Sequence, residues 1–124
     1  MLDHVAAFGG FSVDDIPVAR DFYRDVLGVD VVAQMGGLLR LRLAGGSEAI
    51  VYPKPDHVPA SFTILNFAVS DIERAVDELT SSGIQMLRYE GFGQDERGIS
   101  RNPGGPPIAW FEDPAGNVLA VLEG

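Results

Sequence analysis

Few side chains in this sequence are of the types that usually carry out chemistry. There is no cysteine among the 124 residues, which excludes thiolate nucleophiles, disulfides and Cys-rich zinc sites. His4 lies near the N-terminus and His57 lies in the proline-rich stretch PKPDHVP, so we expect both to be exposed. No Ser–His spacing suggests a catalytic triad, and no GxGxxG or GxxxxGK[ST] pattern suggests a phosphate-binding loop.

The polar groups with more potential are arginines on a predicted strand. In LLRLRL (38–43) the leucines alternate with Arg40 and Arg42, so one face of the strand is apolar and the other is basic. When Gly46 is aligned with Gly116, Arg40 matches Trp110. A pocket with one guanidinium and one indole would suit a planar or anionic small molecule. The alternative is a solvated face for the arginines, with Trp110 in the core or at an interface.

Composition limits the classes of partner. With 9 basic and 18 acidic residues the net charge is −9, so nucleic acid and anionic membranes are poor partners. The length fits one domain, and a hydrophobic fraction of 46% is enough for a compact core. No apolar run could cross a bilayer, and the start MLDHVAAFGGF lacks the basic region of a signal peptide. We therefore expect a cytoplasmic protein.

The sequence repeats itself. The stretch FSVDDIPVARDFYRDVLGV (11–29) aligns with FAVSDIERAVDELTSSGI (67–84), and six identical pairs share one offset of 56 residues. Gly28 and Gly83 follow with a slip of one residue. A repeat of this kind determines the architecture, because each copy predicts the same order of elements. The six pairs are Phe11/Phe67, Val13/Val69, Asp15/Asp71, Ile16/Ile72, Ala19/Ala75 and Asp21/Asp77.

Each copy predicts a strand, a helix and three further strands, and therefore an α+β fold. Asp15 and Asp71 stand where a helix N-cap belongs, and Gly28 and Gly83 stand where the helix ends. Asp14 and Asp113 are likewise interpreted as cap and turn residues. The predicted strands cover about 5–13, 29–34, 37–43 and 48–52 in the first copy, and about 62–69, 84–90, 107–112 and 117–122 in the second.

One segment departs from the repeat. The stretch GFGQDERGISRNPGGPP (91–107) contains five glycines and three prolines, which rules out a regular element. It is either a mobile surface loop or a flap over a binding site. In the second interpretation, Arg97 and Arg101 would neutralise an anionic ligand.

The paired βαβββ copies, together with DFYRDVLG and WFEDPAGN, resemble the vicinal oxygen chelate superfamily. That superfamily includes glyoxalase I, extradiol dioxygenases, fosfomycin-modifying enzymes and bleomycin-type resistance proteins. The resemblance covers essentially the whole chain. It implies one domain in which two modules form a curved, cup-shaped mixed sheet with helices on its outer face. Module one would span about 1–53, the linker about 54–61 and module two about 62–124.

The metal enzymes of this superfamily hold a divalent metal in the cup. The resemblance places the ligands at a His or Gln on the first strand of a module and a Glu on its last strand. The matching positions here are Phe8 and Ile64 on the first strands, and Ile50 and Ala120 on the last. None of these side chains has a lone pair to offer. The resemblance therefore implies a cup with no metal and no cofactor.

We expect a metal-free protein that binds and sequesters a small planar or anionic molecule, and is not an enzyme. One alternative is a metal-dependent lyase or dioxygenase with displaced ligands, such as Glu48 or His4. Another is a non-catalytic structural or interaction module. The resemblance also implies a homodimer, in which modules of two chains meet. The expected ligand-binding residues are Phe8, Arg40, Tyr52, Phe62, Ile64, Asn66, Arg97, Arg101, Trp110 and Ala120.

Overall fold

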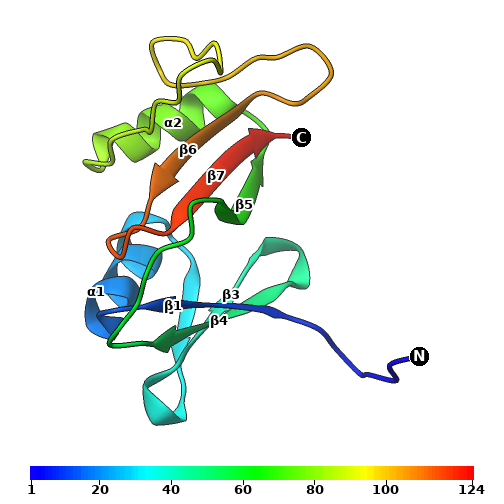
Figure 1. The fold of residues 1–124 in the computed structure, drawn as a ribbon, viewed down its shortest axis with the longest axis vertical. Coiled ribbons are helices and arrows are strands. Elements are labelled where there is room, and N and C mark those ends of the chain that lie inside the picture. The colour runs from blue at the N-terminus through cyan, green and yellow to red at the C-terminus, as the bar shows by residue number, and fades with distance from the viewer. The chain divides into compact units, whose positions relative to one another are not determined.

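The computed structural model describes all 124 residues, and the chain divides into two compact units. Unit 1 is Met1–Val58 and unit 2 is Pro59–Gly124, so the boundary falls inside the stretch that we expected as a linker. Each unit has one sheet and one α-helix, shown in Figure 1. The α+β class predicted from the sequence is confirmed. No helix has both the length and the apolar character needed to span a membrane.

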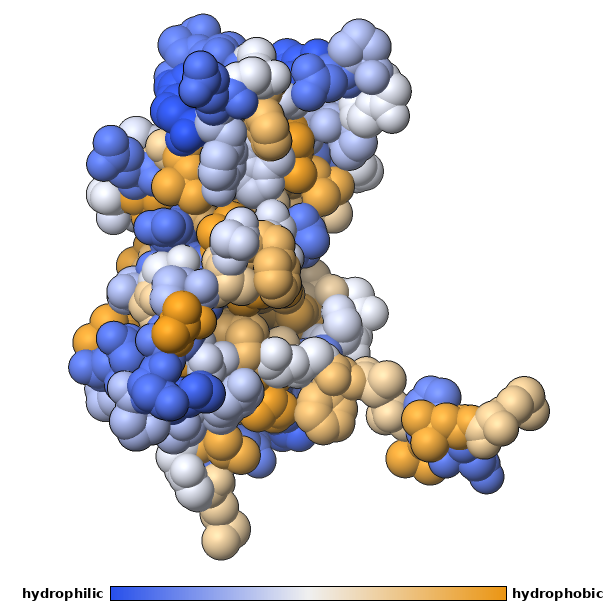
Figure 2. All heavy atoms as spheres, viewed as in Figure 1, coloured by the Kyte–Doolittle hydropathy of each residue, from blue (hydrophilic) through white to orange (hydrophobic).

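Unit 1 has the predicted order βαβββ. Its sheet has the strand order β1-β4-β3-β2, in which β1 and β4 are parallel and the other neighbours are antiparallel. The N-terminal residues before β1 are exposed, and in Figure 2 they project away from unit 1 as a stretch of mixed hydropathy. The elements are β1 (Gly9–Val13), α1 (Ile16–Asp21), η1 (Phe22–Val26), β2 (Asp30–Ala33), η2 (Met35–Gly37), β3 (Leu39–Arg42), η3 (Ala44–Gly46) and β4 (Glu48–Pro53).

Unit 2 has a smaller sheet with the strand order β5-β7-β6. Strands β5 and β7 are parallel, and β6 and β7 are antiparallel. Helix α2 contacts β7 and buries Ile72 and Val76. Figure 1 shows the long connection from α2 to β6. The elements are β5 (Thr63–Val69), α2 (Ile72–Ser81), β6 (Ile108–Glu112) and β7 (Val118–Glu123).

The strand predicted at 84–90 does not form. The backbone N–H of Leu87 donates to the carbonyl of Trp110 at 2.8 Å, which is the start of a ladder beside β6. The side chain of Gln94 then takes the next backbone groups. Its Oε1 accepts from the N–H of Tyr89 at 2.6 Å, and its Nε2 donates to the carbonyl of Leu87 at 2.8 Å. The glutamine side chain thus replaces the strand partner that would have continued the ladder.

The two helices begin in the same way, as the repeat predicts. Asp15 (φ −140°, ψ 104°) and Asp71 (φ −141°, ψ 98°) are both extended N-caps. The carboxylate of Asp15 accepts from the N–H of Val18, and that of Asp71 accepts from the N–H of Arg74, each at 3.1 Å. Each bond satisfies one of the backbone donors that a helix leaves free at its start.

The helices end differently, and this explains the slip of one residue between the repeats. After α1 the chain forms a π-helical turn, η1, in which the N–H of Leu27 donates to the carbonyl of Phe22 at 3.1 Å. A π-turn accommodates one residue more than an α-turn. Gly28 (φ 70°) and Gly83 (φ 92°) then close the two segments in the left-handed region that favours glycine.

Candidate ligand-binding site

The sheet of unit 1 has one buried face and one partly open face. Leu39 lies opposite Val51, which lies opposite Phe11, and all three are buried. One residue further along, Arg40 lies opposite Ile50 and Ile50 opposite Gly10. Because neighbouring residues of a strand point to opposite faces, this second row lies on the other side of the sheet. The open face therefore carries Arg40 among apolar or small residues.

The guanidinium of Arg40 has one N–H group without a hydrogen-bond partner. Its Nε is buried and makes no hydrogen bond, although it lies 3.7 Å from the carboxylate of Glu48 in a loose ion pair. The whole side chain is only partly exposed. Because the Nε atom is closed off, a ligand would meet the exposed part of the side chain, whose remaining guanidinium N–H groups can donate to an oxygen atom.

Tyr52 and Ser12 lie opposite each other on β4 and β1, also on this face, and Tyr52 is 40% exposed. The hydroxyl of Ser12 lies 2.6 Å from Nδ1 of His57. This pair was not predicted from the sequence, because its members are 45 residues apart. The parallel pairing of β1 and β4 would have indicated it, since Ser12 lies on β1 and His57 follows the end of β4 closely. The N–H of His57 donates to the carbonyl of Lys54 at 2.9 Å, which keeps it near that end. The face thus carries a hydrogen-bonded hydroxyl and imidazole.

The sheet of unit 2 repeats this arrangement. Asn66 lies opposite Ala120, and Ala120 opposite Trp110. The adjacent row faces α2, because the carboxylate of Glu123 accepts from the N–H of Ile72 at 3.1 Å. Trp110 and Ala120 therefore lie on the face away from the helix, where Arg40 and Ile50 lie in unit 1. Ala120 is fully buried, Asn66 is exposed and Trp110 is intermediate.

Two predicted site residues lie outside the strands. Phe8 was placed on a strand beginning near residue 5, but β1 begins at Gly9 and Phe8 is 66% exposed. Phe62 precedes β5 and is 69% exposed. Both strands are thus shorter at the N-terminal end than the apolar pattern predicted.

Ile64 also differs from expectation. We placed it beside Asn66 by simple alternation, but the register shifts between Thr63 and Leu65, which lie opposite Val118 and Leu119. Ile64 is therefore the extra residue of a β-bulge. A bulge breaks the alternation of faces, so the spacing from Asn66 does not place Ile64 on its face.

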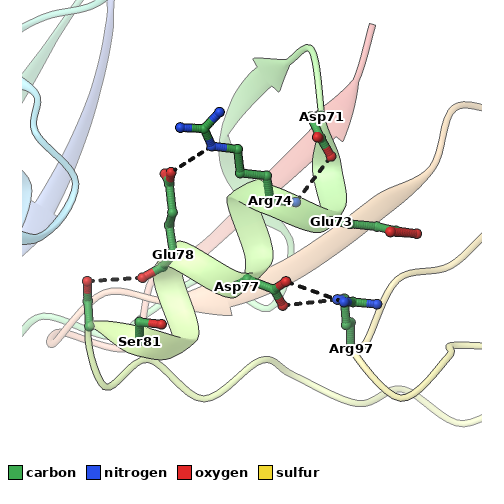
Figure 3. A pocket seen from close by; sticks show the side chains of 8 residues that line it. Asp71, Glu73, Arg74, Asp77, Glu78, Ser81 and Arg97 are labelled. Carbon is green, nitrogen blue, oxygen red and sulfur yellow. Dashed lines mark hydrogen bonds and ion pairs between the residues drawn. The ribbon is translucent and has the colours of Figure 1, made fainter.

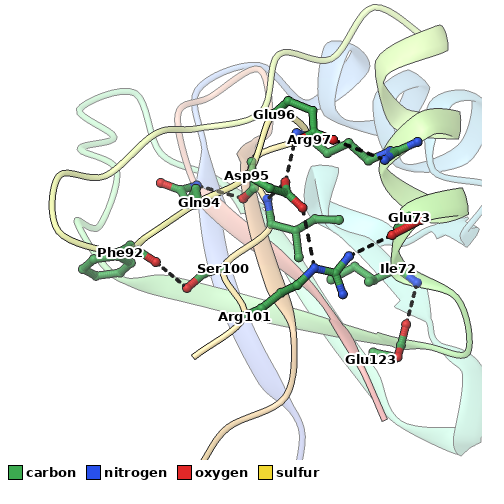
Figure 4. A network of polar contacts seen from close by, with 12 residues as sticks. Ile72, Glu73, Phe92, Gln94, Asp95, Glu96, Arg97, Ser100, Arg101 and Glu123 are labelled. Atoms are coloured by element: carbon green, nitrogen blue, oxygen red, sulfur yellow. Dashed lines mark hydrogen bonds and ion pairs between the residues drawn. The ribbon is translucent and has the colours of Figure 1, made fainter. Parts of the chain in front are cut away.

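The two arginines of the 91–107 loop contact α2. Arg97 donates to both carboxylate oxygens of Asp77, at 2.9 and 3.3 Å, as Figure 3 shows. Arg101 donates to Glu73 at 3.0 Å, as Figure 4 shows. Since α2 covers the face opposite Trp110, the structure does not bring these arginines together with the indole. The pKa of Arg97 is raised above its ordinary value, first by the hydrogen bond with Asp77.

The same part of the loop is organised by Asp95. Its Oδ1 accepts from the N–H groups of Arg97 and Ile99, both at 2.9 Å. Burial alone would raise the pKa of Asp95, but these two bonds and the charge of Arg101 outweigh burial and lower it. Residues 95–101 are therefore fixed by local hydrogen bonds, although the chain there forms no helix or strand.

Three aromatic rings gather beside β6. The ring of Trp110 lies 5.3 Å from those of Tyr89 and Phe92, and these two rings are 5.4 Å apart. Burial, and then the charge of Glu112, raise the pKa of Tyr89. Next to the cluster is a pocket of about 410 Å³. Its lining residues are Gly91, Phe92, Ser100, Asn102, Gly105, Pro106, Ile108 and Trp110.

The sequence analysis predicted Trp110 as a site residue but missed Phe92, Ser100 and Asn102. These residues come from the loop, where no periodicity assigns faces. A second hollow, about 690 Å³ along the exposed side of α2, is a weaker candidate. Its charged side chains already pair with one another, as Arg97 with Asp77 and Arg74 with Glu78 in Figure 3.

The residues at the four expected metal positions do not fit a divalent metal. Phe8, Ile50, Ile64 and Ala120 have hydrocarbon side chains, whereas divalent metals need oxygen, nitrogen or sulfur donors. Elsewhere in the chain, no three His, Asp or Glu side chains lie close enough together to hold a metal ion.

These features define an α+β protein built from two similar units, each with a helix on one face of a mixed sheet. The chain belongs to the glyoxalase/bleomycin resistance protein/dioxygenase superfamily, whose sequence model matches residues 1–121. The superfamily predicted from the two sequence motifs is therefore confirmed. No curated protein matches the chain at a significant level.

Solved structures with the same fold cover nearly the whole chain. The fosfomycin resistance protein FosX from Listeria monocytogenes has a TM-score of 0.75 at 10% identity, over 100% of this chain and 95% of its own. A superfamily member from Sphaerobacter thermophilus has a TM-score of 0.74 at 20% identity, over 97% and 98%. TnmS3, an antibiotic-binding protein from a Streptomyces species, has a TM-score of 0.71 at 22% identity, over 98% of both chains.

Proposed function

We propose that this protein binds and sequesters a small molecule without a metal and without transforming it. The observation that carries the proposal is the set of side chains at the four metal positions, Phe8, Ile50, Ile64 and Ala120, none of which can donate an electron pair. A cup that has lost its Lewis acid retains shape and apolar surface, which are sufficient for binding.

The open faces of the two sheets supply suitable contacts. Arg40 offers a partly exposed guanidinium in unit 1, and Trp110 offers an aromatic surface in unit 2. Tyr52 and Asn66 lie on the same faces. The names of two proteins of like fold, one for fosfomycin resistance and one for antibiotic binding, support a drug-like or metabolite-like ligand.

Arg97 and Arg101 belong to this proposal only conditionally. To reach a ligand beside Trp110 they must leave Asp77 and Glu73. Ion pairs between exposed side chains are weak, so an anionic ligand could compete with them. We therefore propose that the 91–107 loop acts as a flap over the site only when these two ion pairs break.

Elemental analysis and thermal shift test the proposed function together. Purified protein is expected to contain no stoichiometric Ni, Zn, Mn or Fe, and a library of small molecules should include some that raise the melting temperature, because a ligand that binds only the folded state stabilises it. Near-stoichiometric metal that disappears on Glu48→Ala or His4→Ala would instead establish the lyase or dioxygenase alternative. No metal and no thermal shift with any compound would favour a structural module.

We also propose that the two units form one domain, and that the protein acts as a cytoplasmic homodimer. The exposed apolar side chains Leu2, Val5, Phe8 and Phe62 support association, because such surface is costly in water. Sedimentation at micromolar concentration should give twice the chain mass of 13.3 kDa. A species of single-chain mass would contradict the dimer, and cell fractionation tests the location.

A further inference from the structure

The pocket beside Trp110 contains no charged side chain. The loop approaches β6 there and contributes Phe92, Pro106 and Asn102, while the strand contributes Ile108 and Trp110. Its volume, about 410 Å³, is in the range of sites for small molecules. Phe92 is 42% exposed, so the aromatic wall is accessible to a ligand.

The hydrogen bonds of the pocket leave a side-chain acceptor, Oδ1 of Asn102, unused. The hydroxyl of Ser100 donates to the carbonyl of Phe92 at 2.7 Å, as Figure 4 shows, and accepts from Nδ2 of Asn102 at 3.1 Å. Ser100 is buried, so this arrangement is fixed. The bond orients the amide of Asn102 through its nitrogen and leaves its carbonyl oxygen, Oδ1, without a protein donor.

The charges around the pocket disfavour an anion. The two nearby arginines of the loop point to Asp77 and Glu73 on α2. The charge of Glu112 acts on Tyr89, which contacts both Phe92 and Trp110. The whole chain also has a net charge of −9. Arg88, next to Tyr89 in the chain, donates to the carbonyl groups of Asp95 and Glu96. The lining of the pocket has no charged side chain, so it lacks the fixed cation that an anionic ligand needs.

We propose that this pocket binds a flat aromatic group that is neutral or cationic and carries an N–H or O–H donor. The rings of Phe92 and Trp110 are inclined by 64°, so the aromatic group stacks on one of them and meets the other edge to face. Its donor bonds to Oδ1 of Asn102. A cationic donor gains further from the faces of the two rings. This inference rests on the proposed function and names the chemical class that the unit 2 part of the site accepts.

Trp110 is the only tryptophan in the chain, so it reports on the pocket directly. The experiment follows its indole N–H signal by ¹H–¹⁵N NMR during titration with four probes on one ring system. These probes are 2-naphthol, 2-methoxynaphthalene, 2-naphthoate and 2-naphthylmethylammonium. They provide, in that order, a neutral donor, a neutral group without a donor, an anion and a cationic donor.

Naphthol and naphthylmethylammonium should shift the signal with the highest affinities. Methoxynaphthalene, which lacks the donor, should bind about threefold to tenfold more weakly than naphthol, the equivalent of one hydrogen bond. Naphthoate should bind at least about tenfold more weakly than naphthol. Asn102→Ala should remove the preference for naphthol over methoxynaphthalene. Phe92→Ala should weaken all four probes, and the control Met35→Ala, at an exposed residue of unit 1, should change none.

Two results would overturn the inference. One is naphthoate binding as tightly as naphthol. The other is a preference for naphthol that survives Asn102→Ala in protein whose melting temperature is unchanged. If compounds raise the melting temperature but no probe shifts the Trp110 signal, the pocket assignment fails while the proposed function stands. If no compound of any kind binds, both fail.

Discussion

The two units close the turn before their last strands with the same backbone hydrogen bond, but they differ in the other residues of the turn. In unit 1 the N–H of Leu43 donates to the carbonyl of Ser47 at 2.9 Å, and in unit 2 the N–H of Asp113 donates to that of Asn117 at 3.0 Å. Gly46 (φ 89°) and Gly116 (φ 84°) adopt the same left-handed conformation at matching positions. The preceding residue differs, because Gly45 (φ 85°) is also left-handed whereas its counterpart Ala115 is not. Unit 1 therefore depends on two glycines in this turn and unit 2 on one.

Unit 2 adds a network that unit 1 lacks. Oδ1 of Asp113 accepts from the N–H groups of Ala115 and Asn117, both at 2.9 Å, and Oδ2 accepts from Nδ2 of Asn117 at 3.0 Å. Asp113 and Asn117 are buried, whereas Ser47 is exposed. Turns closed by the same backbone hydrogen bond can thus be built with a second left-handed glycine, as in unit 1, or with a buried carboxylate, as in unit 2.

The largest expected effect comes from removing that carboxylate. Asp113→Ala should lower the free energy of unfolding by about 2–3 kcal/mol, because it leaves buried backbone donors without an acceptor. The control Ser47→Ala, at the exposed position of unit 1 that corresponds to Asn117, should stay within about 0.5 kcal/mol. Urea denaturation measures both. Equal losses would show that the side-chain network in unit 2 adds nothing to the turn.

The next largest effect is expected from replacing the matching turn glycines, Gly46 and Gly116. Gly46→Ala should cost about 1–2 kcal/mol, the penalty of a left-handed alanine. Gly116→Ala should cost more, because its new methyl group would lie 3.1 Å from the ring of Pro59, whereas nothing lies within 4 Å of the methyl group at Gly46. The difference between the two unfolding free energies tests the comparison, and a larger loss at Gly46 would contradict it.

The third prediction concerns the helix N-caps, where the two units have the same structure. Asp15→Ala and Asp71→Ala each remove one hydrogen bond of 3.1 Å to the start of a helix. Each should lower the free energy of unfolding by about 1 kcal/mol. Asp→Asn at either position should restore most of the loss, since asparagine also caps helices. A clear difference between the two sites would mean that the repeat is not energetically equivalent.

The smallest effect is expected from the loop arginines, which have no counterpart in unit 1. The double variant Arg97→Ala/Arg101→Ala should lower the melting temperature by a few degrees at most, because exposed ion pairs contribute little. The difference from the unaltered protein should shrink at high salt, where such pairs are screened. A large loss that persists in high salt would show that the loop supports the fold.

Features that depend on neighbouring residues could be predicted from the sequence. The caps at Asp15 and Asp71, the closing glycines and the alternation around Arg40 all follow from short-range patterns. The matching register of Arg40 and Trp110 also agrees with the internal alignment. In these places the local preference and the final structure coincide, so the repeat was sufficient.

Features that depend on distant side chains could not be predicted. The strand predicted at 84–90 does not form because the side chain of Gln94, in the loop that follows, bonds to its backbone groups. The strand propensities of residues 84–90 do not show this. The pair of Ser12 and His57 needs the parallel pairing of β1 and β4. Loop composition allowed either partner for Arg97 and Arg101, and only the fold shows that α2 supplies Asp77 and Glu73.

The π-turn η1 shows how the fold can accommodate one inserted residue in a helix. An extra residue in a regular α-helix rotates everything after it by about 100°, which would turn the following buried side chains out of the core. Here the turn from Phe22 to Leu27 takes up the additional residue within a single widened loop of backbone. Gly28 can then close its helix as Gly83 does. If the two halves descend from one duplicated ancestor, this turn records an insertion or deletion that was tolerated because the backbone absorbed it locally.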